Sequence, residues 1–324
     1  MRSRVARACA LLCLAGLVAC MGSPEVVGSA GGRHGSSDRS TNRWLDPGKG
    51  ARGSEGPAPS TATKPYEGLG TWIDIYDTDV WEHPVRAVRS MAAHGIRTIY
   101  LQSSNYHRNQ PFVHPEGVAA IVDAAHRQRL EVVAWYLPGF RDLALDLHRA
   151  VRTIRFETRS GNGFDSFALD IESAEVRRPS LRTARLLRVS SAIRRAAGRG
   201  YPLGAIVVSP DRLVRTDPYF WPGFPWRELA ETYDVFLPMT YHTYRVEGPR
   251  ATSRYTARSV QVIRRQTSGL RVPIHVVGGI SFDATGPETQ GFVDTVLERD
   301  VIGASYYTFP GITVDQWKAL SELR

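Results

Sequence analysis

Eight short β-rich runs alternate with eight helical segments between residues 66 and 324, and this alternation constrains the fold more than any other feature. The predicted strands are residues 70–76, 98–103, 131–137, 166–172, 204–209, 235–241, 274–278 and 302–307. The predicted helices are residues 85–94, 116–129, 141–157, 181–199, 226–232, 255–266, 288–299 and 314–323. This size and rhythm predict a (β/α)₈ barrel of the α/β class. The alternative, a doubly wound open sheet, usually carries a Gly-rich turn after its first strand, whereas residues 77–81 contain no glycine.

The residues before the barrel carry export signals. Three arginines at positions 2, 4 and 7 precede an apolar run that ends in Leu17-Val-Ala-Cys20. A basic start and a short apolar run predict a signal peptide over residues 1–20, and its ending resembles a bacterial lipobox, in which Cys20 would be lipidated. An ordinary secretory peptide cut nearby is the alternative. Residues 21–65 are rich in Gly, Ser and Pro and predict a flexible linker. We therefore expect an extracytoplasmic, lipid-anchored protein whose barrel spans residues 66–324.

The cysteine positions and the net charge limit which kinds of partner and cofactor we expect. All three cysteines lie at positions 9–20, so the mature chain has no internal disulfide. The 41 basic residues outnumber the 32 acidic ones, which suits anionic cell-wall polymers or lipid headgroups, although a solvated basic surface explains the excess equally well. No nucleic-acid motif is present, no His, Cys and Asp cluster has metal-ligand spacing, and we expect neither cofactor nor metal. We expect a monomer.

The fourth predicted strand ends in two carboxylates, Asp170 and Glu172. Side chains alternate along a strand, so both carboxylates lie on one face, opposite Leu169 and Ile171. Active sites of such barrels lie at the carboxyl ends of the strands, which makes both acids candidates for catalysis. The same rule, with the aromatic loop at 219–226, gives these candidate substrate-binding residues: Asp74, Tyr76, Gln102, Trp135, Tyr136, Trp221, Met239, His242 and Tyr307.

Carboxylates surrounded by aromatic rings suit carbohydrate chemistry. Rings pack on the apolar faces of sugars, while glycosidic cleavage needs an acid beside the leaving oxygen and usually a second carboxylate. Burial and Asp170 are expected to raise the pKa of Glu172. The alternative is a structural role in which Asp170 and Glu172 pair with the nearby Arg177 and Arg178.

The segment Asp165-Ser-Phe-Ala-Leu-Asp170-Ile-Glu172 resembles the DxxDxDxE signature of glycoside hydrolase family 18, the chitinase-like barrels. Met239-Thr-Tyr241 resembles the M-x-Y of that family. The resemblance implies that Glu172 is the general acid/base, that Asp170 orients an acetamido group and that Tyr241 holds the reacting group. Ala168 departs from the motif, as do Leu237 and His242 beside M-x-Y and the tyrosines that replace a Trp after the last strand.

The strand-four D-x-E together with Asp74 also resembles family 25 lysozymes, which cleave peptidoglycan. These partial matches predict a divergent glycoside hydrolase that acts on a polysaccharide or cell-wall glycan. Two alternatives remain open at this stage. A non-catalytic glycan-binding lipoprotein would explain Ala168, and a structural cell-envelope protein would have its barrel plugged by the aromatic loop.

Overall fold

The predicted alternation of strands and helices is present in residues 63–324, which are the residues that the computed structural model describes. The strands are β1 (Gly68–Ile73), β2 (Thr98–Asn105), β3 (Glu131–Leu137), β4 (Ser166–Ile171), β5 (Leu203–Val207), β6 (Val235–Pro238), β7 (His275–Ile280) and β8 (Gly303–Tyr307). Each overlaps one predicted run. The observed strands end up to three residues earlier or later than predicted, because strand pairing rather than composition sets their length.

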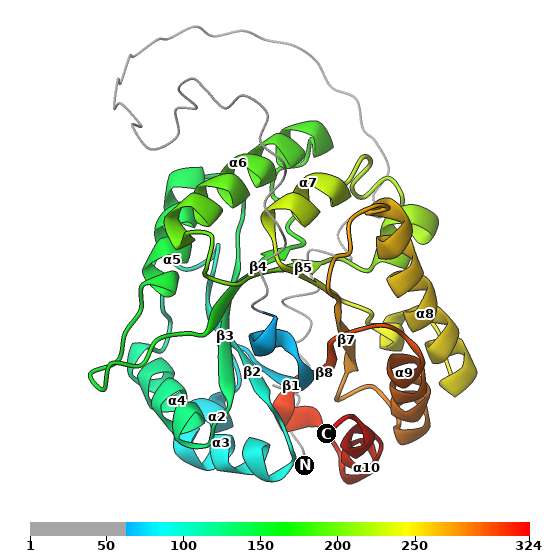
Figure 1. The fold of residues 1–324 in the computed structure, drawn as a ribbon, viewed down its shortest axis with the longest axis horizontal. Helices are drawn as coiled ribbons and strands as arrows, with labels where there is room; N and C mark the ends of the chain where they lie inside the picture. The colour runs from blue at the N-terminus through cyan, green and yellow to red at the C-terminus, as the bar shows by residue number, and fades with distance from the viewer. Residues whose placement is uncertain (1–62) are drawn as a thin grey trace, which may run out of the picture. The chain divides into compact units, whose positions relative to one another are not determined.

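The strands form one parallel sheet that closes into a barrel. Each of β1 to β5 pairs in parallel with the next strand, and β8 pairs in parallel with both β1 and β7. The remaining seam, between β6 and β7, is bridged by Phe236 with Ile274 and Met239 with Val277, and the amide of Thr240 donates to the carbonyl of Val277 over 2.8 Å. The first and last strands lie side by side, which confirms the barrel and excludes the open sheet (Figure 1).

The helices form an outer ring around the strands (Figure 1). They are α2 (Thr78–Glu82), α3 (Pro84–Ala93), α4 (Pro115–Arg127), α5 (Leu143–Ile154), α6 (Pro179–Ala197), α7 (Trp226–Thr232), α8 (Pro249–Gln266), α9 (Gly286–Glu298) and α10 (Val314–Leu320). Proline begins α3 and α4, since its missing N–H would have no partner in the first turn. Capping boxes begin α9 and α10, where Thr285 pairs with Glu288 and Thr313 with Gln316.

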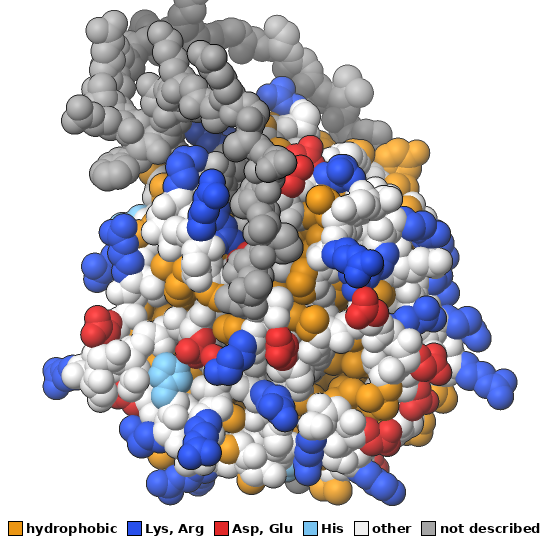
Figure 2. Space-filling model, viewed as in Figure 1, with side chains coloured by type: hydrophobic (Ala, Val, Ile, Leu, Met, Phe, Trp, Pro, Cys, Tyr) orange, Lys and Arg blue, Asp and Glu red, His pale blue; other side chains and the backbone are white. Residues whose placement is uncertain are grey.

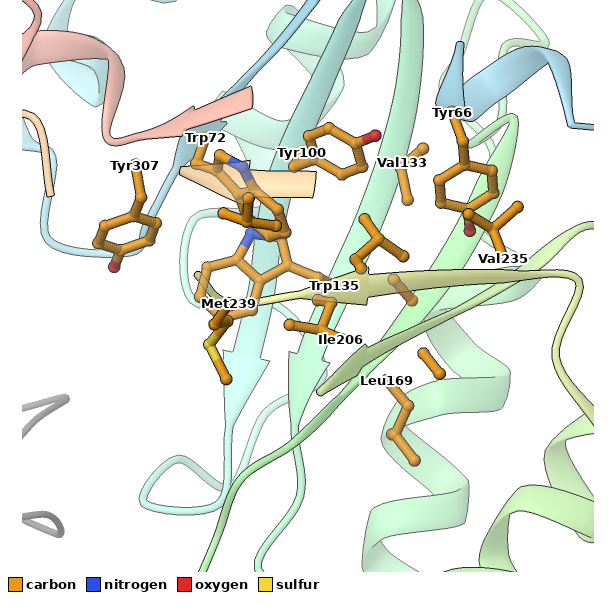
Figure 3. Close-up of a cluster of buried hydrophobic side chains, with 14 of the residues drawn as sticks. Tyr66, Trp72, Tyr100, Val133, Trp135, Leu169, Ile206, Val235, Met239 and Tyr307 are labelled. Atoms are coloured by element: carbon orange, nitrogen blue, oxygen red, sulfur yellow. The ribbon is translucent and has the colours of Figure 1, made fainter. Parts of the chain in front are cut away.

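Aromatic rings fill the barrel interior. Trp72 of β1 stacks on Tyr100 of β2 with ring centroids 4.4 Å apart, and the Trp72 indole N–H donates to Ser305 over 2.8 Å. His275 bonds to the carbonyl of Tyr66 and to the Ser305 hydroxyl, and burial lowers its pKa to about 4. The histidine, the first residue of β7, is therefore a neutral packing residue. Figure 3 shows Tyr66 at one end of this cluster, with Trp72 and Tyr307 toward the other.

The described chain begins just before the barrel. Lys64–Tyr66 is a single 3₁₀ turn, and the buried Tyr66 hydroxyl lies 2.5 Å from that of Ser166. The predicted signal peptide, Cys20 and the predicted linker up to residue 62 lie outside the described residues. Among the helices of residues 63–324, none has the length and apolar character needed to cross a bilayer. On the face seen in Figure 2, basic side chains are scattered among acidic and neutral ones.

Helices α8 and α9 approach closely at one glycine, which gives a testable prediction. A Cβ on Gly291 would lie 2.3 Å from the carbonyl oxygen of Pro249, and backbone atoms cannot move aside cheaply. We expect Gly291→Ala to lower the free energy of unfolding by about 1–3 kcal/mol, measured by urea denaturation. Gly200→Ala is the matched control, since nothing lies within 4 Å of its Cβ position. Equal stability of the two variants would contradict the prediction.

Candidate active site at the carboxyl end of the barrel

The carboxylates of strand β4 lie where alternation predicts. The register aligns Trp135 with Ala168 and Asp170 with Ile206, on the inward-facing layers of the sheet. Asp170 is 5% exposed, and one of its carboxylate oxygens, Oδ1, is buried with no hydrogen-bond partner among the described residues. Glu172 follows the strand and is half-buried. Strand geometry thus directs the buried carboxyl group of Asp170 and the half-buried carboxyl group of Glu172 toward the same end of the barrel.

Burial and mutual repulsion shape the titration of this pair. Burial raises the pKa of Glu172 to about 7, and the guanidinium of Arg212 opposes this rise. Burial, and then the charge of Glu172, raise the pKa of Asp170 well above its usual value. Asp170 therefore bears the effect of the repulsion, while burial raises the pKa of Glu172. A second negative charge beside the buried Asp170 is unfavourable, so the pair tends to keep a proton near neutral pH.

If Asp170 and Glu172 had only a structural role, they would need arginine partners. Within residues 63–324, no basic nitrogen lies within 4.0 Å of a carboxylate oxygen of Asp170 or Glu172. The side chains of Arg177 and Arg178 are exposed instead. A buried carboxyl group without a partner is costly, which favours a function for Asp170 over a structural ion pair.

The raised pKa of Asp170 has a consequence for stability. A carboxyl group whose pKa is higher in the folded than in the unfolded protein destabilises the fold as pH rises above the unfolded pKa. We therefore expect Asp170→Asn to raise the free energy of unfolding by about 1–3 kcal/mol at about pH 8, with a smaller difference at about pH 4. Urea denaturation at both pH values measures this. The exposed Asp300→Asn is the control, and an Asp170→Asn variant less stable than wild type at about pH 8 would refute the expectation.

A second acidic group follows β1. Asp74 is 5% exposed, and its carboxylate accepts hydrogen bonds from the Tyr307 hydroxyl over 2.9 Å and the Tyr76 amide over 2.6 Å. The amide of Asp74 donates to Asp77 over 2.9 Å, and its carbonyl accepts from the Trp81 indole over 2.8 Å. Every polar group of Asp74 is thus engaged, and the carboxylate joins the end of β1 to the end of β8. Burial raises the pKa of Asp74.

Aromatic side chains gather beside this group. The Tyr307 ring lies 6.0 Å from that of Tyr241 and 6.3 Å from that of Trp72, which meets Trp135 edge-on at 5.7 Å. Figure 3 shows Tyr307, Trp72, Trp135 and Met239 on the same side of the buried cluster. Gln102 lies in the same layer and uses its carbonyl oxygen to accept from the Ile75 amide over 3.0 Å. The structure therefore brings together residues predicted from β1, β2, β3, β6 and β8.

Three predicted ligand contacts lie elsewhere. Tyr136 is buried and bonds to Asp146 and Arg149 of α5, because strand alternation turns it outward from Trp135. His242 is fully buried beside Tyr306 and Gly279, and burial lowers its pKa to about 4. We therefore leave Tyr136 and His242 out of the proposed site.

Trp221, the third of these residues, is 1% exposed and packs beside α6. Its indole donates to Thr183 over 2.9 Å, and the guanidinium of Arg182 lies 4.0 Å from its ring centroid. This part of the aromatic loop anchors to an outer helix, so Trp221 is also left out of the site.

Two features of the family 18 signature differ in role from the acid pair. Asp165 lies before β4 and accepts from the Val132 amide over 2.7 Å and from His126 over 3.0 Å, so it holds the start of the strand. Ala168 is fully buried one layer below Asp170, and its methyl group offers Asp170 no hydrogen bond. The motif is thus retained in outline, without its internal acid.

Sequence reasoning missed Asp77 and Arg212. Burial and then the charge of Asp74 raise the pKa of Asp77 well above its usual value, and the Asp74-Ile-Tyr-Asp77 cluster after a strand was the available signal. Arg212 pairs with Asp217 at 2.7 Å and lies 4.2 Å from the centre of the Phe220 ring. No local pattern reveals that the charge of Arg212, which begins the short helical segment Arg212–Thr216, opposes the rise in the pKa of Glu172. Among residues 63–324, no group of three or more metal-ligating side chains is close enough to hold an ion.

The fold and this cluster define a parallel (β/α)₈ barrel with paired carboxylates and aromatic rings at its carboxyl end. Its structural neighbours are glycoside hydrolase barrels. The endo-beta-1,4-mannanase from Thermotoga petrophila aligns with a TM-score of 0.60 and 11% identity, covering 80% of this chain and 76% of that chain. GH5_18 from Streptomyces cattleya in complex with GlcNAc gives 0.61 and 14%, covering 79% of each chain.

The spore cortex-lytic enzyme SleL of Bacillus cereus gives a TM-score of 0.59 and 11% identity, covering 79% of this chain and 74% of that chain. No family model and no curated protein matches the sequence. At these identities the likeness establishes the (β/α)₈ barrel fold alone, and the activity has to be argued from the site.

Proposed function

We propose that this protein hydrolyses a glycosidic bond in a polysaccharide or cell-wall glycan. The observation that carries the proposal is Glu172, a half-buried carboxyl group with a pKa of about 7, next to a second acid at the end of β4. A general acid is most effective when its pKa is near the working pH. The structural neighbours support the substrate class, since they include a mannanase, a protein in complex with GlcNAc and a cortex-lytic enzyme.

In the proposed reaction, protonated Glu172 gives its proton to the glycosidic oxygen as the bond from that oxygen to the anomeric carbon breaks. The resulting carboxylate then takes a proton from the water that attacks the anomeric carbon. Where the sugar carries an N-acetyl group, Asp170 and Tyr241 would position that group for attack from within the substrate. Asp74, Tyr76, Gln102, Trp135, Met239 and Tyr307 would line the sugar-binding surface.

The test is release of reducing ends from chitin, mannan and peptidoglycan by wild-type protein and by Glu172→Gln. Hydrolysis by the wild type and its loss in the variant would support the proposal. Equal turnover of an accepted substrate by both proteins would exclude Glu172 as the acid.

A non-catalytic glycan-binding protein is the second candidate, and one observation favours it. Ala168 leaves Asp170 without the buried acid that the family 18 motif places beneath it. Glycan retention without any released product, in wild type as in Glu172→Gln, would identify a binder. Under either function, we propose that lipidation of Cys20 tethers the barrel outside the cytoplasmic membrane through the linker at 21–65.

A further inference from the structure

Two exposed aromatic rings lie on neighbouring loops at the carboxyl end of the barrel. Phe282, two residues after β7, exposes 49% of its surface, and Tyr244, six residues after β6, exposes 42%. A surface that several exposed apolar side chains share marks a candidate binding surface, whereas a single exposed apolar side chain does not. Neither ring belongs to the carboxylate cluster described above, so both need a separate explanation.

The turn that carries Phe282 is tightly fixed. The amide of Ser281 donates to the Tyr307 carbonyl over 2.6 Å, and its hydroxyl donates to the Thr308 carbonyl over 2.7 Å. The buried Gln316 donates to the carbonyls of Ser281 and Ala284 over 3.0 and 2.9 Å. The turn is therefore bonded both to the end of β8 and to α10. A ring on such a support loses little conformational freedom when it binds a ligand.

The Phe282 ring is also supported from below. A Cβ at Gly311 would lie 2.8 Å from Cδ2 and Cε2 of Phe282, so the ring rests on a backbone surface that only glycine leaves open. The Cδ2–Cε2 edge of the ring therefore lies against the Gly311 backbone, while 49% of the surface of Phe282 remains exposed.

Tyr244 is tied to the same turn. Its hydroxyl donates to the carboxylate of Asp283 over 3.2 Å, and burial with the charge of Asp283 raises its pKa to about 12. The phenol consequently stays protonated at neutral pH. Asp283 is exposed and retains acceptor capacity for other hydroxyl groups. The surface thus combines two rings with a carboxylate, which matches the apolar face and the hydroxyl rim of a sugar.

We propose that Phe282, Tyr244 and Asp283 form an accessory glycan-binding platform, and that the ligand is a glycan chain of several units rather than a short glycoside. The platform adjoins the proposed site, since Tyr244 follows Tyr241 by three residues and Ser281 bonds to the backbone of Tyr307. The inference that the bound glycan runs from the platform toward Glu172 rests on the proposed function. The binding itself does not.

The experiment measures co-sedimentation with insoluble chitin, mannan and peptidoglycan sacculi, using Glu172→Gln as the background so that the polymer stays intact. We expect Phe282→Ala and Tyr244→Ala each to weaken binding to the retained polymer about five- to tenfold, with unchanged thermal unfolding. Tyr244→Phe should lose less polymer binding than Tyr244→Ala, because it keeps the ring. Leu297→Ala is the matched control, an exposed apolar residue at the other end of α9.

Unchanged binding by both alanine variants, or no binding of any polymer by the background protein, would overturn the platform. The platform would also be overturned if the alanine variants lost only their binding to phosphatidylglycerol vesicles, which would assign the rings to a membrane. A loss only of self-association would likewise overturn it and assign the rings to contact with a second copy of the chain. The two proposals fail separately. If Glu172→Gln hydrolyses the polymer at the wild-type rate while Phe282→Ala loses binding, only the catalytic assignment is wrong, and the reverse pattern removes only the platform.

Discussion

Replacing Glu172 with glutamine is expected to lower kcat on an accepted glycan about 10²–10⁴-fold, the usual contribution of a general acid. Glutamine has nearly the shape of a protonated glutamic acid but has no proton to give. Because burial raises the pKa of Glu172 to about 7, the wild-type rate should fall as pH rises above that value. The residual rate of Glu172→Gln should lose this dependence. Reducing-end assays across the pH range measure both effects.

Two controls make this result specific. Glycan binding by Glu172→Gln should remain close to that of the wild type, since the substitution removes a proton donor and leaves the aromatic rings in place. The exposed Glu175→Gln, three residues further along, should leave the rate unchanged. A wild-type rate that does not fall above about pH 7 would show that another group is the acid.

Replacing Arg149 with methionine is expected to lower the free energy of unfolding by about 3–5 kcal/mol, because it leaves a buried carboxylate without its cation. Arg149 and Asp146 are each 2% exposed, and Arg149 Nη1 lies 3.7 Å from Asp146 Oδ1 and 2.8 Å from the Tyr136 hydroxyl. Arg149 also donates to the carbonyl of Arg108. Methionine keeps much of the aliphatic stem, so the loss comes mainly from the charge. Denaturation by urea at about pH 7 measures it.

A double-mutant cycle separates the charge from the packing. Asp146→Asn together with Arg149→Met should recover part of the lost stability, since no buried charge then lacks a partner. Arg152→Met, an exposed position on the same helix, should change stability by no more than about 0.5 kcal/mol. Additive effects of the Asp146 and Arg149 substitutions would show that the two residues do not act as a pair.

The barrel could be predicted because its signals are local and repeated. Each of the eight β-rich runs contains branched or aromatic residues, and each helix segment has its own proline, capping or glycine signal. The ends of the strands were predicted less accurately than their order. Residues 239–241 were predicted as strand, yet β6 ends at Pro238, where a missing N–H limits further pairing, and only Met239 continues as a bridge.

The candidate site could be predicted only where local alternation was sufficient. The inward placement of Asp170 follows from its position in β4, and the meeting of Asp74 with Tyr307 follows from the closure of the barrel. Tyr136 and His242 could not be placed, because being near the end of a strand does not fix which face a side chain takes. Trp221 belongs to a loop, where no periodicity applies, and its hydrogen bond to Thr183 spans 38 residues of sequence.

By itself, the sequence determined the order of strands and helices and the acid pair that closes β4, because both depend on neighbours a few residues apart. Only the tertiary structure decided that Asp170 Oδ1 has no hydrogen-bond partner among residues 63–324, that burial raises the pKa of Glu172 to about 7 and that the Phe282 ring lies against Gly311. Burial and electrostatic environment depend on side chains contributed by distant strands and loops. Those groups meet only once the barrel has closed.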